Sequence, residues 1–192
     1  MKKMKAKDIL VPAVSLLIIC LVATVLLALT NNVTKGKIAQ NAVDTENASR
    51  QLVLSAATDF SQAENYKDTA ITYCKGNDKS GNLVGYIFTS AAKGYGGDVK
   101  IMVGLDTNGK IIGFEILDCS NETPGLGQNS KKPEFKERFI GKSGVLTVDK
   151  NSNEGQNIQA ITAATITSKA VVSAVNAAMD AFNEITGGAS NG

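Results

Sequence analysis

The chain contains no histidine and no tryptophan, and it has only three cysteines in 192 residues. Without histidine it lacks the imidazole group, the commonest metal ligand and the usual acid or base near neutral pH. The cysteines stand at positions 20, 74 and 119, so no two of them form a CxxC pair. Zinc and iron–sulfur sites depend on suitably spaced Cys or His ligands. The sequence therefore predicts no metal centre held by this chain alone.

A strong excess of charge of either sign is also absent. Lys and Arg total 20 against 18 Asp and Glu, which leaves a formal net charge of +2. Domains that bind nucleic acid present a basic patch, and those that bind single strands add aromatic side chains. No such patch occurs here, and aromatic residues make up only 5% of the chain. We therefore expect no nucleic-acid partner.

One long uncharged run lies near the N-terminus. Lysines crowd residues 1–8, whereas residues 9–29 carry no charged side chain. About 20 apolar residues in a helix cross the roughly 30 Å hydrocarbon layer of a membrane. This pattern predicts a transmembrane helix over residues 9–30, with Pro12 in its first turn, where proline is tolerated. A cleaved signal peptide is the alternative, but its apolar core is normally only about 7–15 residues long.

The lysine cluster also predicts the orientation of the chain, because short positively charged ends stay in the cytoplasm. We expect a single-pass cell-membrane protein with residues 1–8 in the cytoplasm. Residues 31–57 are polar with periodic apolar positions, which predicts a connecting helix. Residues 58–192 are then expected to form an extracytoplasmic domain. Outside the cytoplasm Cys74 and Cys119 could form a disulfide, and two unpaired thiols fit the sequence equally well.

The extracytoplasmic part alternates β-rich segments with turn residues. The predicted strands are residues 71–74, 83–89, 99–105 and 110–117. The last two flank an Asn108-Gly109 pair, which is typical of tight hairpin turns. Consecutive hairpins produce an antiparallel sheet.

Two amphipathic segments follow the strands. Residues 133–142 predict a short piece that places Phe135, Phe139 and Ile140 in the core. From Val171 onward, apolar residues recur at helical spacing. The expected fold is therefore α+β, with an antiparallel sheet packed by helices.

Hydroxyl groups are concentrated just before the C-terminal helix. They belong to Thr162, Thr165, Thr167 and Ser168, and small alanines stand among them. Backbone N–H groups at a helix N-terminus have no partner within the helix, and together with the helix dipole they favour phosphate binding. Thr and Ser are also ordinary N-caps, and spacing alone favours that role.

Two glycine-rich loops lie earlier in the chain. One is Gly94-Tyr95-Gly96-Gly97, and the other is Glu122-Thr123-Pro124-Gly125-Leu126-Gly127. Glycine in such loops either forms a simple turn or allows the backbone to approach a ligand closely.

The hydroxyl-rich segment resembles the attachment motif of a family of FMN-binding domains. This family includes the G subunit of the Rnf complex and the C subunit of the sodium-pumping quinone reductase. Its motif runs roughly Asp-x-x-Ser/Thr-Gly-Ala-Thr, and the last threonine is esterified to the phosphate of FMN. That threonine corresponds to Thr165, while Gln159 replaces the family's Asp and Ala163 its Gly.

Both glycine-rich loops match the same family and occur in the expected order. The family usually has a histidine before the second loop, where this chain has Cys119-Ser120-Asn121. The resemblance implies covalent FMN on Thr165. It also implies FMN contacts from Tyr95, Gly96, Gly97, Glu122, Thr123, Gly125, Leu126, Gly127, Thr162, Ala164, Thr167 and Ser168.

By this resemblance the chain is a flavoprotein subunit of an ion-translocating ferredoxin:NAD oxidoreductase, the Rnf complex, and relays electrons within it. The implied partners are a second flavin-bearing membrane subunit, iron–sulfur subunits and, for maturation, a flavin transferase. Self-attachment is not expected, because a threonine hydroxyl needs an activating base and the chain has no histidine.

Three alternatives stay open at this point. The chain could be a carrier like the C subunit of the quinone reductase, or an extracellular electron-transfer flavoprotein. It could also be a membrane-tethered assembly module without flavin, a possibility that rests on the substitutions Gln159 and Ala163.

Overall fold

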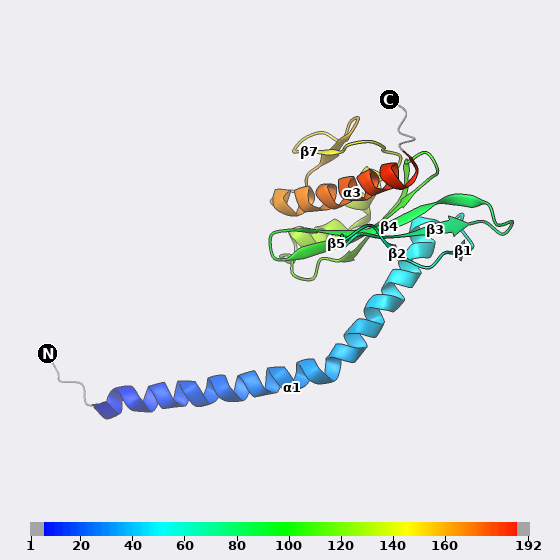
Figure 1. The fold of residues 1–192 in the computed structure, drawn as a ribbon. Coiled ribbons are helices and arrows are strands. Elements are labelled where there is room, and N and C mark those ends of the chain that lie inside the picture. Colours follow the sequence, from blue (N-terminus) through cyan, green and yellow to red (C-terminus); the bar gives the residue numbers. More distant parts are fainter. Residues whose placement is uncertain (1–5, 188–192) are drawn as a thin grey trace. The chain divides into compact units, whose positions relative to one another are not determined.

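The computed structural model describes residues 6–187, which divide into two units with the boundary after Asp44. The first unit consists of most of helix α1 (Ala6–Val53), which is long and apolar enough to cross a membrane by length and composition (Figure 1). The lysines before position 6 lie outside the described residues. Pro12 lies inside this helix and not in its first turn, so the helix lacks the hydrogen bond that residue 12 would donate. The expected connecting helix is the continuation of α1, and it ends at Val53.

The second unit is built on an antiparallel sheet. Its strands run in the order β1-β3-β4-β5-β6, and β2 pairs with β3 beside β1. The four predicted strands are present, with bounds shifted by a few residues. The strands are β1 (Asp59–Phe60), β2 (Glu64–Asn65), β3 (Thr72–Asn77), β4 (Leu83–Lys93), β5 (Asp98–Leu105) and β6 (Ile111–Asp118).

Short elements connect the sheet to the last helix. They are η1 (Gly127–Lys131), α2 (Pro133–Lys136), η2 (Glu137–Phe139), and the parallel pair β7 (Thr147–Asp149) and β8 (Asn157–Gln159). Helix α3 (Thr165–Ile185) then packs across β4 and β5 (Figure 1). An antiparallel sheet packed by helices confirms the expected α+β fold. Strands β1, β2, β7 and β8 were not predicted, because two or three residues are too short to show an alternating pattern.

The face of the sheet under α3 carries the larger core. Phe182 of α3 meets Phe88 of β4 in an edge-to-face contact with ring centroids 6.3 Å apart. Phe135 and Phe139 are buried as predicted, and Phe139 stacks on Phe114 at 4.4 Å. The prediction for Ile140 was wrong: this residue is 47% exposed, at the point where η2 ends and the backbone becomes extended.

The opposite face of the sheet receives the end of α1. Val53 and Leu54 are buried there with Ala57, Cys74, Ile87 and Met102. The helix end can approach this closely because a row of glycines crosses four strands. A Cβ added at Gly76 would lie 2.8 Å from the Ala57 side chain, and one added at Gly85 would lie 3.1 Å from the Leu54 side chain. A Cβ added at Gly104 or Gly113 would lie 3.0 or 2.5 Å, respectively, from the carbonyl carbon of Val53.

The two cysteines of this unit are free and buried. Cys74 belongs to the cluster around Val53, whereas Cys119 belongs to the larger cluster under α3. They therefore lie on opposite sides of the sheet, which rules out the disulfide and leaves the alternative of two unpaired thiols. Burial also raises the pKa of the Cys74 thiol, which keeps it protonated and unreactive.

The glycine row predicts the effect of a single methyl group. Gly104→Ala should lower the free energy of unfolding by about 1–3 kcal/mol or more, because the added Cβ overlaps the backbone of Val53. Gly36→Ala is the control, since a Cβ there meets nothing within 4 Å. Urea unfolding of the detergent-solubilised chain measures both. Equal stability of Gly104→Ala and wild type would contradict the close packing.

The position of Val53 and Leu54 also predicts where the folded unit begins. A fragment starting at Thr45 should unfold cooperatively, whereas a fragment starting at Thr58 should have a lower Tm and bind a hydrophobic dye. The shorter fragment exposes Cys74, Ile87 and Met102, which the end of α1 covers. Thermal circular dichroism and dye fluorescence compare the two. Identical melting curves would show that the end of α1 is only a linker.

Candidate functional site

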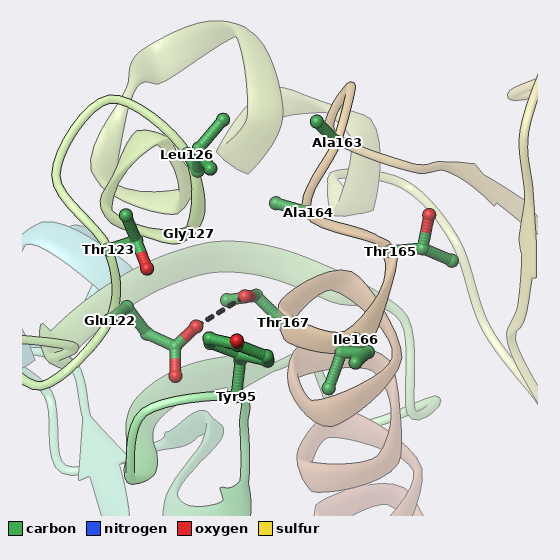
Figure 2. Close-up of a pocket in the computed structure, with 10 residues that line it drawn as sticks. All are labelled: Tyr95, Glu122, Thr123, Leu126, Gly127, Ala163, Ala164, Thr165, Ile166 and Thr167. Carbon is green, nitrogen blue, oxygen red and sulfur yellow. Dashed lines mark hydrogen bonds between the residues drawn. The ribbon is translucent and has the colours of Figure 1, made fainter.

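A pocket of about 600 Å³ opens where three loops of the second unit meet. It combines the β4–β5 loop, the loop after β6 and the start of α3, which are far apart in sequence (Figure 2). Its size lies within the usual range for small-molecule and cofactor sites, about 300–1,000 Å³. Its lining residues are Tyr95, Glu122, Thr123, Leu126, Gly127, Ala163, Ala164, Thr165, Ile166 and Thr167.

Glu122 is the polar centre of this pocket and is only 2% exposed. One carboxylate oxygen, Oε1, accepts a hydrogen bond from the backbone N–H of Gly96 at 2.9 Å. The other, Oε2, accepts one from the hydroxyl of Thr167 (Figure 2). Glycines make room for this carboxylate, because a Cβ at Gly94 would lie 2.5 Å from Oε1 and one at Gly127 would overlap Oε2. A single buried side chain therefore ties together all three segments that form the pocket.

The loop that carries Glu122 is held by its own amide groups. Gln128 donates a side-chain hydrogen bond to the carbonyl oxygen of Glu122 at 2.9 Å, and Asn129 donates one to that of Gly125 at 2.6 Å. Gly125 has φ +77°, a conformation that favours glycine. The loop is thus shaped before any ligand binds, which favours precise placement of Glu122.

The hydroxyl groups around the start of α3 divide into two kinds. Thr167 and Ser168 are buried, and the Thr167 hydroxyl donates a hydrogen bond to Glu122. The Ser168 hydroxyl accepts a hydrogen bond from the N–H of Ile161 at 2.9 Å and donates one to the carbonyl oxygen of Ala164 at 3.0 Å. Thr162 is exposed and Thr165 half-buried, and within residues 6–187 neither hydroxyl makes a hydrogen bond. Of the four hydroxyls, those of Thr162 and Thr165 are therefore the two without a partner among the described residues.

None of these hydroxyls caps the helix. The N-cap position is Ala164, which makes no side-chain cap hydrogen bond. The expectation of an ordinary Thr or Ser cap was therefore wrong, because Thr167 binds Glu122 and Ser168 binds Ile161 and Ala164 instead. The first N–H groups of this 21-residue helix consequently remain available beside Thr165. Their dipole and donors favour an anion such as a phosphate ester at this place.

Ala163 has an unusual backbone conformation. Its φ is +58°, in the left-handed region that glycine adopts freely and that costs other L-residues about 1–2 kcal/mol. This is the position at which the resembling motif has glycine. The loop therefore keeps a glycine-like shape in this chain although alanine occupies it. An alanine methyl group is small enough for that shape, because the side chain is exposed.

The rim of the pocket is apolar. Tyr95, Leu126 and Ile166 surround the opening with exposed fractions of 73%, 39% and 54%. Ile166 was not among the predicted site residues; it lies in the first turn of α3, where its side chain is exposed. In Figure 2 the Thr165 side chain points away from the Glu122–Thr167 pair, so the hydroxyl lies beside the pocket and not at its floor.

The other expected site residues lie outside this pocket. Gly125 and Thr162 line a neighbouring pocket of about 430 Å³ that shares Leu126 and Ala163 with the first and also contains Arg138 and Gln159. Gly96 contributes its N–H to Glu122, and a side chain at Gly97 would meet Asn121 at 2.8 Å. Ser168 is a structural residue. Among the residues described, no group of three His, Cys, Asp or Glu side chains is placed to hold a metal ion.

The pocket and the free start of α3 lie within a part of the chain whose class the family match identifies as an FMN-binding domain. Residues 94–180 match the family model described as the FMN-binding domain, and residues 1–51 match that of the RnfG N-terminal region. The protein is 35% identical over 175 residues to the G subunit of the proton-translocating ferredoxin:NAD(+) oxidoreductase complex of Clostridium ljungdahlii, covering 91% of both chains. It is 37% identical over 188 residues to the G subunit of the Na(+)-translocating complex of Acetobacterium woodii, covering 89% and 90%.

The chain belongs to the family of RnfG proteins, the G subunits of ion-translocating ferredoxin:NAD(+) oxidoreductase complexes. Its fold is similar to that of the C subunit of the Na(+)-translocating NADH-quinone reductase from Parabacteroides distasonis. The TM-score is 0.57 at 19% identity, and the match covers 77% of this chain and 94% of that one.

Ala163 gives a testable prediction about the loop. Ala163→Gly should raise the free energy of unfolding by up to about 1 kcal/mol, because relief of the left-handed strain exceeds the greater entropy of glycine in the unfolded chain. Ala160→Gly is a matched control without positive φ and should be destabilising. Urea unfolding measures both. A destabilised Ala163→Gly variant would contradict the strain.

Proposed function

We propose that this chain carries FMN in phosphoester linkage to the Thr165 hydroxyl. It relays electrons as a subunit of an ion-translocating ferredoxin:NAD(+) oxidoreductase. The observation that carries the proposal is the placement of a free hydroxyl at the exposed start of α3, next to a preformed pocket. A phosphate on Thr165 would be stabilised by the free N–H groups of that helix end.

The choice of Thr165 among four candidate hydroxyls is supported by burial and by position. Thr167 and Ser168 are 1% and 0% exposed and already hydrogen-bonded, so a transferase cannot reach them. Thr162 is accessible but lines the neighbouring pocket. Thr165 is accessible, lines the larger pocket and is the first residue of the helix.

Attachment requires a second protein. A neutral threonine hydroxyl is a weak nucleophile without a base, and the chain has no histidine. Glu122 is no substitute, because its carboxylate faces Thr167 and not the Thr165 side chain (Figure 2). We infer a flavin transferase that uses FAD: Thr165 Oγ bonds to the phosphorus of the FMN half, the P–O bond to AMP breaks, and AMP leaves. A base of the transferase takes the hydroxyl proton.

The residues of the pocket fit a flavin. Bound FMN supplies one- and two-electron transfer through its ring, and the protein supplies position and polarity. Tyr95, Leu126 and Ile166 offer apolar surface for the ring, and the Thr123 hydroxyl is exposed at the pocket wall. A covalent link prevents the loss of the flavin from a domain that faces open solvent.

The long apolar helix supports a membrane-anchored carrier. The proposal places residues 1–8 in the cytoplasm and the sheet unit on the extracytoplasmic face, because of the lysines before the apolar run. The remaining Rnf subunits, including a second flavin-bearing membrane subunit and iron–sulfur subunits, are the proposed partners. The Clostridium relative is named for protons and the Acetobacterium relative for sodium, so similarity to both is compatible with either coupling ion.

The attachment site is tested by in-gel flavin fluorescence of the denatured chain, expressed with a flavin transferase. Wild type should fluoresce, Thr165→Ala should be dark, and the matched variant Thr162→Ala should stay labelled. Thr165→Ala should unfold within about 1 kcal/mol of wild type, since its hydroxyl neither caps α3 nor binds another group. A dark wild-type band, with a control protein labelled in the same cells, would contradict the proposal and favour a module without flavin.

A further inference from the structure

A groove of about 480 Å³ lies between strand β7 and helix α3 (Figure 1). One wall is the segment Leu146-Thr147-Val148, and the other is one side of α3. The residues that α3 contributes are Lys169, Val172, Ser173, Asn176, Ala177 and Asp180. The groove shares no residue with the two pockets around Leu126 and Ala163, so the flavin site described above does not account for it.

Strand β7 has a free edge on the side of α3. In its parallel pairing with β8, the backbone groups of Thr147 and Asp149 bond to β8, which directs those of Val148 to the opposite edge. At that edge the side-chain amide of Asn176 binds both the N–H and the carbonyl oxygen of Leu146, each at 2.9 Å. The hydrogen bonds among residues 6–187 include neither backbone group of Val148.

An unpaired strand edge is a template for an extended chain. Val148 is only half-buried, and its free N–H and C=O can pair with a strand that is added beside β7. Such a strand would continue the hydrogen bonds that the Asn176 amide makes to Leu146. Backbone pairing of this kind accepts an extended segment and excludes a helix.

The ends of the groove carry opposite charges. Lys169 and Asp180 lie about 16 Å apart along α3, which is the length of about five extended residues. Both side chains are exposed, and neither makes a salt bridge among residues 6–187. A segment with an acidic side chain near Lys169 and a basic one near Asp180 therefore matches the groove in length and in charge.

The groove begins one helical turn after the proposed attachment residue. Thr165, Lys169 and Ser173 are spaced by four residues and share one side of α3, so Lys169 and Ser173 follow Thr165 by about 6 and 12 Å. A transient protein complex covers about 600 Å² of each partner, a patch of about 14 Å radius. A protein that acts on the Thr165 hydroxyl therefore also covers the near half of the groove.

We propose that the flavin transferase binds this groove with an extended segment of its own chain. The segment pairs with the N–H and C=O of Val148 and directs an acidic side chain toward Lys169. This inference rests on the proposed function, since it requires that a separate enzyme attach FMN to Thr165. Because the groove lies outside the flavin pocket, it contributes to binding of the carrier protein and not to the transfer step.

Labelling kinetics test the groove on the full chain in detergent, with purified transferase and FAD. Ser173→Trp fills the groove and should lower kcat/KM for the carrier protein at least tenfold, mainly by raising KM. Ser173 is exposed, so the variant should keep the Tm of wild type. Ser80→Trp is the matched control, because Ser80 is an exposed serine in the β3–β4 turn and lines none of these cavities. Wild-type kinetics for Ser173→Trp would overturn the proposal.

Amide hydrogen exchange tests the strand pairing itself. The Thr165→Ala chain and FAD-loaded transferase form a complex that cannot react. In this complex the Val148 N–H should exchange at least tenfold more slowly than in the free chain, because it gains a partner. The Thr147 N–H, which already bonds to the carbonyl oxygen of Gln156 at 3.0 Å, should change less. Unchanged exchange at Val148, with amides around position 165 protected, would overturn the proposal.

The outcomes separate this inference from the proposed function. A wild-type chain that is never labelled, while a control carrier is labelled, would overturn the proposed function and the groove's role with it. Equal labelling of wild type and Ser173→Trp keeps the phosphoester and removes the groove. If Ser173→Trp is labelled normally but its flavin is reduced more slowly in the complex, the groove binds another subunit and the inference is overturned. If Ser173→Trp does not fold, hydrogen exchange decides alone.

Discussion

The arrangement of the pocket depends on one requirement, that the buried Glu122 carboxylate be hydrogen-bonded. A carboxylate at 2% exposure is stable only if the surrounding chain supplies donors. The β4–β5 loop supplies the Gly96 N–H and the first turn of α3 supplies the Thr167 hydroxyl. Because these donors come from distant parts of the sequence, satisfying one side chain brings three segments to fixed positions. The same interactions shape the cavity that these segments line.

The hydroxyl-bearing residues around the start of α3 are arranged beside this core in two different ways. Thr167 and Ser168 fix the loop from inside, which leaves Thr165 free at the helix start. Ala163 turns the chain through a left-handed conformation, so Thr165 follows directly at the first helical position. A hydroxyl without a partner is thus held in place by residues that are themselves buried and hydrogen-bonded.

The glycine row on the other face of the sheet serves a different purpose. It lets the backbone at Val53 lie directly on strands β5 and β6, so the last turns of α1 belong to the folded unit. A side chain on Gly104 or Gly113 would separate the helix from the sheet. Apolar packing therefore holds the segment that follows the proposed membrane anchor, without a flexible linker between that segment and the sheet.

Much of this molecule could be predicted from local patterns. The uncharged run, the Asn108-Gly109 hairpin and the helical spacing after Val171 determine the apolar helix, the antiparallel sheet and α3, since each depends on residues close in sequence. The short motifs around Tyr95, Glu122 and Thr165 also identified the segments of the pocket. What the sequence could not determine depends on partners distant along the chain. Only the tertiary structure decided that Cys74 and Cys119 lie on opposite faces, that Ile140 and Ile166 are exposed, and which hydroxyls are buried. The burial of Glu122 belongs to the same group, because whether a carboxylate is buried and which donors it binds depend on the segments that fold around it.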